Sequence, residues 1–404
     1  MMGHGSLRIA IVGGGIGGLT TALALRHHGL EAHVYEQAEE FTEVGAGLGL
    51  GLNAVRILDR LGLEQALDRI AAHVPGYEMR RWYDGDVIVE AHRDPPPPNL
   101  RAHQVHRAEF LDLLLHAVDM RQLHPGKRCV HVEDCGDEVR LDFEDGSTAV
   151  ADVVVGADGI HSVVRALHYD DRPLFSGIVA YRGLIPMERL DFLGYHREIS
   201  TFWLGPRQHF LIYPVSGGRV MNLVAFVPAD GEEVRESWSA GGEVDRLAEH
   251  FRGWEDQVIE VIRSLDGTMR WALYEREPLP AWSIGRTTLL GDAAHAMQPH
   301  MGQGAGQSIE DAAVLAGCLK EARPATLHRW LRLYEDLRRP RSSRVQEASR
   351  RAGEIYEMVD EQEQRRLAPE ALRGRGNWIW GHDVDRSFEE ARAALLAEDP
   401  TTPA

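Results

Sequence analysis

The feature that most constrains the fold is a glycine-rich turn near the N-terminus. It follows Leu7 to Val12, an apolar run typical of a buried parallel strand. Gly13, Gly15 and Gly18 match the pattern G-x-G-x-x-G, and a helix is predicted from Leu19 to His28. Glycines at this spacing permit a tight turn and let the backbone approach a pyrophosphate at the helix N-terminus. The stretch therefore predicts an α/β domain with a parallel sheet and a dinucleotide site.

The segment after this helix supports the same interpretation. A second strand is predicted from Ala32 to Glu36, and Glu36 lies 18 residues after Gly18. This is close to the spacing at which a carboxylate meets a ribose hydroxyl. A structural glycine turn is the alternative. The fingerprint does not separate NAD from FAD, but its N-terminal position favours FAD because it leaves room for a second, substrate-bearing region.

A second glycine-rich stretch occurs late in the chain. Thr287 to Leu290 reads as a strand end, Gly291 and Asp292 follow, and a glycine-rich loop then leads into a helix from Gln307 to Leu319. Glycines before a helix let backbone N–H groups meet an anionic ligand. Asp292 could accept hydrogen bonds from a ribose or order a pyrophosphate. A flexible strand–turn–helix is the alternative.

Two further residues lie at the starts of predicted helices. Arg107 precedes a helix from Ala108 to Val118, where a cation opposes the helix dipole, so an anion is expected to compensate it. We predict a phosphate contact, with a surface salt bridge as the alternative. Asp158 follows a buried strand, Asp152 to Val155, at a position where α/β proteins bind ligands.

Composition narrows the class of protein. The net charge of −18 over 404 residues argues against nucleic-acid binding and fits anionic membranes poorly. Three cysteines without a CxxC pair predict neither a disulfide framework nor a metal site, and a reducing cytoplasm is expected. We find no signal peptide and no run of about 20 apolar residues that would span a membrane.

The middle of the chain predicts a different architecture. Strand-like runs separated by turns occur between about residues 171 and 277, and a strand pair with a turn at Asp84-Gly85 lies between Tyr77 and Glu90. We predict an antiparallel sheet inserted into the nucleotide domain, a small meander after Lys127, and a helical C-terminus. These patterns predict the domain limits. The FAD-binding domain is expected to comprise residues 1–75, 99–171 and 281–345, and the substrate-binding domain residues 76–98 and 172–280. A C-terminal helical segment is expected at 346–404. Smaller predictions are a glycine-dense stretch at 44–53, whose backbone could lie against a flat ring or else form an irregular loop, a helix at 54–67, a polyproline segment at 95–98 and disorder at 399–404.

Together the motifs resemble a known family. The G-x-G-x-x-G turn with Glu36, the Asp158-Gly159 motif and the Gly291-Asp292 motif follow the order and spacing of single-component FAD-dependent aromatic hydroxylases. The resemblance covers residues 7–385 and is strongest to the salicylate hydroxylase, 3-hydroxybenzoate 6-hydroxylase and 6-hydroxynicotinate 3-monooxygenase branch. It implies a para-hydroxybenzoate hydroxylase-like fold, FAD as cofactor, and NADH or NADPH and O2 as co-substrates.

The resemblance also implies roles for matching residues. The motif glycines would carry the ADP phosphates and Glu36 the adenosine ribose. Asp158 would serve the pyrophosphates of FAD and NAD(P)H, and Asp292 the ribityl or phosphate part of the flavin. The other implied cofactor contacts are Arg107 at the pyrophosphate, backbone at Val130 by the adenine, Gly47 near the flavin ring, Pro299 near the reacting carbon, and Gly304 and Ala305 at the pyrimidine edge.

In this family NAD(P)H reduces the flavin, and O2 gives a C4a-hydroperoxide whose distal oxygen is attacked by the aromatic substrate. A phenolate is a better nucleophile than a phenol, so a nearby base raises the rate. His209 and Tyr213 lie four residues apart on a predicted strand and face the same side. We predict that one of them handles the substrate hydroxyl and that His300 contacts the substrate. A packing Tyr213 and a surface His209 are the alternatives. His295 is interpreted as structural.

The substrate is left open by the sequence. A small phenolic acid, aminobenzoate or hydroxypyridine is predicted. The alternatives are a larger polyketide-like substrate, which would need a wider pocket, and a non-catalytic flavin-binding protein. Arg182 and Arg219 are the candidates for a carboxylate anchor. A monomer or homodimer is expected.

Overall fold

The computed structural model of the chain describes residues 7–41, 46–92, 101–229, 231, 241–242, 244–373 and 376–398. The start of the glycine-dense stretch, the polyproline segment and the C-terminus predicted to be disordered lie outside these residues. The described part of the glycine-dense stretch contains a strand, Gly47–Leu50, so the alternative of an irregular loop is wrong there. Within the described ranges, no helix is both long and apolar enough to cross a membrane.

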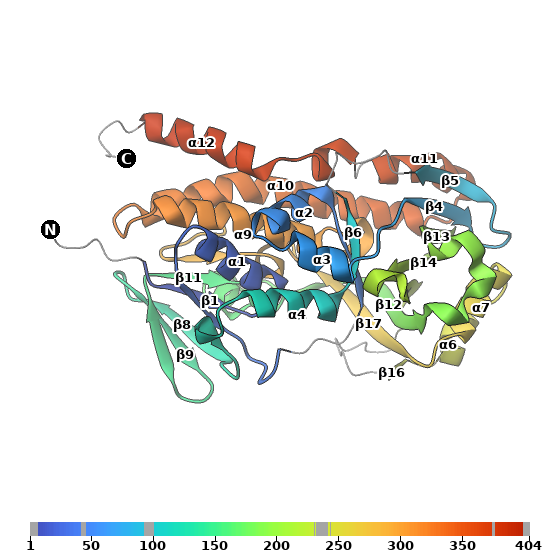
Figure 1. Cartoon of the computed structure of the whole chain (residues 1–404), viewed down its shortest axis with the longest axis horizontal. Coiled ribbons are helices and arrows are strands. Elements are labelled where there is room, and N and C mark those ends of the chain that lie inside the picture. Colours follow the sequence, from blue (N-terminus) through green and yellow to red (C-terminus); the bar gives the residue numbers. More distant parts are fainter. Residues whose placement is uncertain are drawn as a thin grey trace.

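A five-stranded parallel sheet forms one end of the molecule, on the left in Figure 1. Its strand order is β18-β11-β1-β2-β7, so chain order reverses on either side of β1, which is buried throughout. In such sheets ligands bind beyond the carboxyl ends of the strands at the reversal point. The strands are β1 (Ile9–Val12), β2 (Ala32–Tyr35), β7 (Leu123–His124), β11 (Val153–Gly156) and β18 (Thr287–Leu289).

Helices and two small sheets cover this parallel sheet. The largest apolar core of the molecule joins the sheet to these helices. The helices are α1 (Ile16–His27), α2 (Leu52–Arg60), α3 (Glu64–Ile70), α4 (Arg107–Ala117), α5 (Val163–Ala166), α8 (Asp292–His295) and α9 (Gly304–Glu321). The small sheets are the predicted meander β8 (Cys129–Asp134), β9 (Val139–Phe143) and β10 (Thr148–Ala151), and the pair β3 (Gly47–Leu50) and β6 (His103–His106).

The single helix predicted for residues 54–67 is wrong in extent. Helix α2 ends at Arg60, and α3 begins at Glu64. Gly62 between them has a φ of +82°, a left-handed conformation that ends a helix and suits glycine.

An eight-stranded sheet forms the other end of the molecule, in the order β16-β17-β12-β15-β14-β13-β4-β5. The strands are β4 (Gly76–Arg81), β5 (Val87–His92), β12 (Leu174–Pro186), β13 (Ser200–Gly205), β14 (Gln208–Val215), β15 (Val220–Pro228), β16 (Gly241–Gly242) and β17 (Thr268–Glu275). Helices α6 (Val244–His250) and α7 (Asp256–Arg263) pack beside it. The inserted sheet was predicted to be antiparallel, but β13 and β4 run parallel. The two strands belong to segments that are far apart in the chain, so no hairpin connects them and their relative direction is not fixed as antiparallel.

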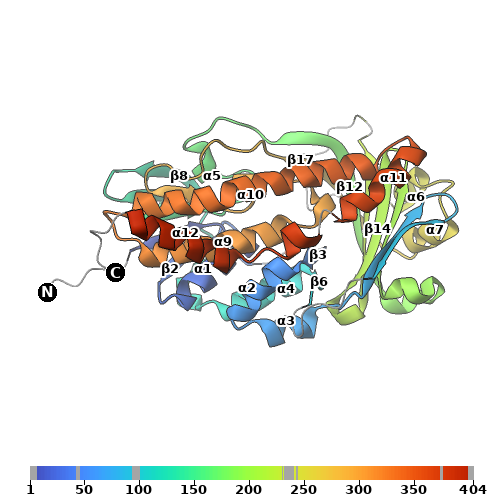
Figure 2. The same cartoon turned by 90° about the horizontal axis from the view of Figure 1, so that it is seen from above.

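The C-terminal part is helical, as predicted, and joins both ends of the molecule. Helix α10 (Leu327–Tyr356) runs from the parallel-sheet end to the eight-stranded sheet, beside α9 (Figures 1 and 2). It passes the expected domain limit at residue 345 without a break. Short 3-10 segments include Pro299–Met301, and the remaining C-terminal helices are α11 (Glu361–Arg373), the π-helix Gly376–Trp380 and α12 (Val384–Glu398).

Candidate active site

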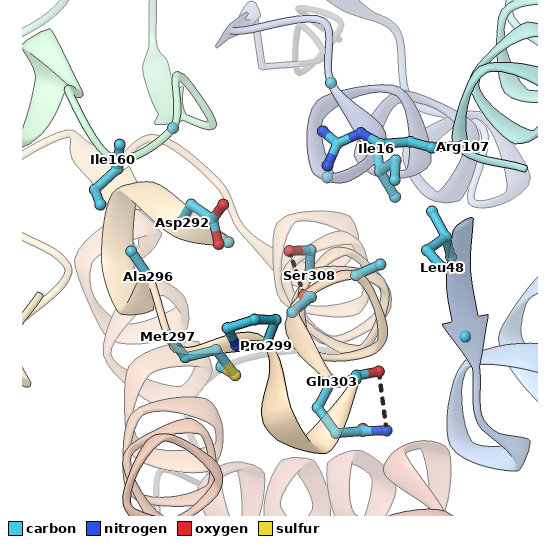
Figure 3. A pocket seen from close by; sticks show the side chains of 18 of the residues that line it. Ile16, Leu48, Arg107, Ile160, Asp292, Ala296, Met297, Pro299, Gln303 and Ser308 are labelled. Carbon is cyan, nitrogen blue, oxygen red and sulfur yellow. Dashed lines mark hydrogen bonds between the residues drawn. The ribbon is translucent and has the colours of Figure 1, made fainter. Parts of the chain in front are cut away.

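A cavity of about 1040 Å³ runs from the carboxyl ends of the parallel strands to one face of the eight-stranded sheet. The glycine turn, the Asp158 motif and the loop after Asp292 all line it, although they lie far apart in the sequence. In Figure 3, the Arg107 and Asp292 side chains point into the cavity from opposite sides, and Ser308 and Pro299 lie below them in the view. Its size is at the upper end for ligand pockets, which suits a dinucleotide together with a small ring.

The three motif glycines meet two different requirements. At Gly13, φ is +105°, and a Cβ would lie 2.3 Å from the Ala157 carbonyl oxygen. At Gly18, a Cβ would lie 2.0 Å from the carbonyl oxygen of Gly13. A Cβ at Gly15 would meet nothing within 4 Å, because this glycine faces the cavity. Two glycines thus allow the turn to pack, and the third leaves the N-terminus of α1 open to a ligand.

Glu36 lines the cavity at the end of β2, and its carboxylate also supports the turn. One oxygen accepts a hydrogen bond from the Gly14 N–H at 2.6 Å, and the other from the Ala38 N–H at 2.9 Å. The ribose contact remains a prediction, and any ribose hydroxyl would share this carboxylate with the turn.

Asp158 lines the cavity too, but both of its carboxylate oxygens accept hydrogen bonds from the start of the helix that follows, α5. Ser162 Oγ donates to Oδ1 at 2.5 Å, and the Val163 N–H donates to Oδ2 at 2.7 Å. Burial raises the pKa of Asp158, and these donors oppose the shift. The carboxylate therefore caps α5, and the pyrophosphate roles predicted for it remain predictions.

The loop after Asp292 brings a helix N-terminus to the cavity. Pro299–Met301 forms a 3-10 turn, Gly302 adopts a φ of +61°, and α9 then begins at Gly304. The first N–H groups of a helix have no acceptor within it, so those at Gly304 and Ala305 are available to a polar ring edge. Asp292 is exposed to the cavity and makes no hydrogen bond or ion pair to any residue the structure describes.

A buried ionic network lies directly behind this loop. Arg338 of α10 contacts Asp311 at 2.7 Å and Glu310 at 2.5 Å, both on α9, and Arg341 contacts Glu310 at 2.6 Å. Burial opposes ionisation of Glu310, but the two arginines hold its pKa down at about 2. Asp311 also binds His295 Nε2 at 2.6 Å and accepts from the Gly291 N–H at 3.1 Å. His295 thus fixes the turn that presents Asp292, which agrees with a structural role.

The other cofactor candidates lie where a long ligand would pass. Arg107 starts α4 and lines the cavity. Gly47 lies on the cavity wall, where a Cβ would come within 2.8 Å of the Tyr213 hydroxyl. Val130 is half-exposed at a register shift between β8 and β9, beside Arg128 and Cys129, which line the cavity. Their roles toward FAD remain predictions.

His209 and Tyr213 both face the cavity from β14, while Phe210 and Ile212 between them pack into the core behind the sheet. His209 is only 1% exposed, so the alternative of a surface histidine is wrong. Four residues of strand separate the two by roughly 13 Å, so they lie at different ends of the substrate region.

His209 belongs to an aromatic cluster at the far end of the cavity. Its ring stacks on Phe226, its cross-strand neighbour, with centroids 4.1 Å apart, and the His300 ring centroid lies 5.3 Å away. Burial lowers the pKa of His209 to about 3, so the imidazole is neutral. A Cβ at Gly353 of α10 would lie 2.6 Å from His300, which shows how closely the helix backs this end.

Tyr213 shares its end of the cavity with Arg182 of β12. Burial raises the pKa of Tyr213 to about 12, and Arg182 opposes the shift. The Arg182 guanidinium lies over the Trp271 ring at 5.0 Å, and its Nε is sealed from solvent without a hydrogen bond. Arg219, the other candidate anchor, lies outside the cavity with a 66% exposed side chain, 3.8 Å from Glu109.

Glu357, at the C-terminus of α10, was not among the predicted site residues. Its Oε1 lies 3.5 Å from His209 Nδ1, and the ligand atoms of Glu357, His209 and His300 lie within 4.8 Å of one another. Burial raises the pKa of Glu357 to about 7, and His300 opposes the shift. Nothing in the local sequence marks this glutamate, because similar acids occur throughout the helix.

These residues fit FAD. The turn is open at Gly15, the N-terminus of α9 faces the cavity, and the cavity continues to an aromatic and histidine-lined end. When bound, FAD would be held by the turn at its pyrophosphate and by the Pro299–Ala305 loop at its ring. It would supply hydride acceptance and oxygen activation.

Known proteins that resemble this chain in sequence or in structure all point to one family. A family model described as an FAD binding domain matches residues 6–349. The 3-amino-4-hydroxybenzoate 2-monooxygenase of Streptomyces platensis is 40% identical, over 93% of this chain and 96% of that protein. A salicylate hydroxylase of Pseudomonas putida is 37% identical, over 96% of this chain and 95% of that protein. A solved salicylate hydroxylase substrate complex aligns with a TM-score of 0.81 at 32% identity, over 96% of this chain and 98% of that one.

The family resemblance, the fold class, the cofactor and the enzymatic nature predicted from the sequence are confirmed. The chain belongs to the FAD binding domain family and, within it, to the FAD-dependent aromatic monooxygenases.

Proposed function

We propose that this monooxygenase hydroxylates the ring of a small aromatic acid that carries a phenolic hydroxyl, with FAD, NAD(P)H and O2. An amino group on the ring is compatible with the site. The observation that carries the proposal is Arg182, a cation in the cavity with no acidic partner among the described residues.

A partly buried arginine without a counter-ion is costly, so the ligand is expected to provide the anion. Burial lowers the pKa of Arg182, Tyr213 raises it, and Arg107 lowers it further. A planar guanidinium matches a carboxylate with two parallel hydrogen bonds. Tyr213 beside it can donate a hydrogen bond, because its raised pKa keeps the phenol protonated.

At the opposite end, His209 lines the cavity as a neutral imidazole, which can accept a hydrogen bond from a phenol and then its proton. Loss of this proton puts negative charge into the ring and makes it a better nucleophile toward the oxygen that reduced FAD activates. The stacked Phe226 ring fixes the imidazole, and His300 lines the same end.

The test is a panel of 3-amino-4-hydroxybenzoate, salicylate and 6-hydroxynicotinate, assayed with purified holoenzyme and either NADH or NADPH. Product mass after reaction in labelled O2 would show one added oxygen atom and would reveal whether the carboxylate is retained. Nicotinamide oxidation that forms only hydrogen peroxide with every compound would contradict the proposal.

The anchor has a matched control. Arg182→Met is expected to raise KM for the acid at least about tenfold, equivalent to about 1.4 kcal/mol. Arg219→Met removes an exposed arginine outside the cavity and is expected to leave KM unchanged. Equal effects of the two substitutions would exclude Arg182 as the anchor.

We also infer a cytoplasmic enzyme that acts as a monomer or homodimer. Light scattering of the purified protein would decide the oligomeric state.

A further inference from the structure

We propose that Glu357 is a positioning residue for His209. It holds the proton of the imidazole on Nδ1, so that Nε2 can take the proton of the substrate hydroxyl, and it stabilises the imidazolium that results. This inference rests on the proposed function, and it adds a residue outside the cavity wall to the proton-handling machinery.

The geometry places one carboxylate behind the histidine. His209 Nδ1 and Glu357 Oε1 are 3.5 Å apart, both are sealed from solvent, and neither has a hydrogen bond of ordinary geometry to a described residue. The His209 ring itself lines the cavity, whereas Glu357 is not among the described residues that do. The order from the cavity outward is therefore substrate, imidazole, carboxylate.

Both members of the pair are fixed by their surroundings. The His209 ring is stacked on Phe226, and Tyr356 packs against its edge with ring centroids 5.4 Å apart. The Glu357 carbonyl accepts a hydrogen bond from the Arg207 N–H at 2.9 Å, in the turn between β13 and β14. Arg207 has a φ of +63°, which is unusual for a residue other than glycine. The turn therefore ties the end of α10 to the strand that carries His209.

The hydrogen bond made by one imidazole nitrogen selects the proton position on the other. With Nδ1–H directed at Glu357, the Nε2 lone pair is free to accept the phenolic proton. The O–H bond of the substrate breaks, an N–H bond forms at Nε2, and the positive charge gained by the ring faces the carboxylate. A carboxylate behind a histidine acts in the same manner in hydrolytic triads.

Two titratable side chains of the described residues face the pair. They are His300 from the loop before α9 and Tyr356 on α10 itself. Burial raises the pKa of Glu357 to about 7. Its ionisation near neutral pH would therefore strengthen the pair as pH rises.

The test uses a phenol whose ionisation is visible, 4-hydroxy-3-nitrobenzoate, bound to the oxidised holoenzyme and titrated with pH by difference absorbance. Wild-type enzyme is expected to lower the apparent pKa of the bound phenol. Glu357→Gln should lose at least about one pH unit of that lowering, and Glu357→Asp should restore part of it. Probe affinity below the transition and FAD content should stay unchanged.

A matched control lies one turn earlier on the same helix. Glu354 is exposed and pairs with Arg351 at 2.8 Å, so Glu354→Gln should behave as wild type. The proposal is overturned if wild-type enzyme leaves the ionisation of the probe unchanged, if Glu357→Gln matches wild type, or if a stoichiometric divalent metal is found on the two histidines and Glu357. If no compound of the panel were hydroxylated, the proposed function would be excluded. The effect of Glu357→Gln on the ionisation of the bound probe would still stand.

Discussion

At the residue scale, Gly15 and Gly18 belong to one motif but have different surroundings. A Cβ at Gly18 would overlap the Gly13 carbonyl oxygen, whereas one at Gly15 would project into the cavity. Gly18→Ala is therefore expected to destabilise the fold by about 1–3 kcal/mol. Gly15→Ala should fold with wild-type stability and weaken FAD binding about tenfold or more. Urea unfolding of the apoprotein and flavin titration separate the effects. Comparable unfolding midpoints for the two variants would contradict this assignment.

His209 allows a prediction about pH. Burial lowers its pKa to about 3, while the unfolded chain has a histidine pKa near about 6.5. The unfolded state therefore binds the proton first, and stability falls as pH drops below about 6.5, by up to about 1.4 kcal/mol per pH unit. His209→Gln should reduce the slope of unfolding free energy between pH 6 and 4 by about one proton. An unchanged slope would mean that His209 is not buried in neutral form.

The same residue shows what sequence can and cannot predict. Strand periodicity placed His209 and Tyr213 on one face, because alternation follows from backbone geometry alone. Glu357 escaped prediction because its meeting with His209 depends on the tertiary path of α10, which ends against a strand 148 positions earlier in the chain. Similarly, Arg182 and Arg219 could be ranked only once the cavity was known.

At the element scale, buried ion pairs join α9 to α10. In the sequence, the arginines of α10 that form these pairs are visible only as a basic segment, and their acidic partners cannot be identified. Arg338 is 1% exposed and faces Glu310 and Asp311, which are fully buried. Removing one partner of such a network leaves a desolvated charge, so Arg338→Ala should cost about 3–5 kcal/mol and impair flavin retention. Arg351→Ala, which breaks an exposed pair, should cost less than about 1 kcal/mol. Thermal unfolding and flavin release would show the contrast, and a stable, flavin-replete Arg338→Ala would contradict it.

Four of the five parallel strands were predictable, whereas the two-residue edge strand β7 and two details elsewhere were not. Apolar runs bounded by glycines located β1, β11 and β18, since buried parallel strands carry a continuous apolar signal. The break at Gly62 was missed because the apolar periodicity continues across it. The parallel pairing of β4 with β13 was missed because it joins segments that lie far apart in the chain.

At the scale of the whole molecule, the cavity is built from both sheets, so ligand binding should couple them. FAD bound only by the folded state would add about 2.7 kcal/mol at a free concentration one hundred times its Kd. Deflavinated protein is therefore expected to melt several degrees below the reconstituted enzyme, with tryptophan fluorescence and circular dichroism moving together. If the eight-stranded sheet unfolded at the same temperature with and without FAD, the two halves of the molecule would be independent.

The path of α10 has a consequence for engineering this enzyme. Helix α10 contacts α9, which follows the glycine-rich loop after Asp292, through Arg338, and it contacts the histidine end of the cavity through Glu357. A chimaera that imports β14 from a relative to change substrate preference would replace His209 while leaving Glu357, the residue 3.5 Å from it, unchanged. Grafts should therefore exchange residues 208–215 together with 353–357, as a single exchangeable unit that no contiguous stretch of sequence contains.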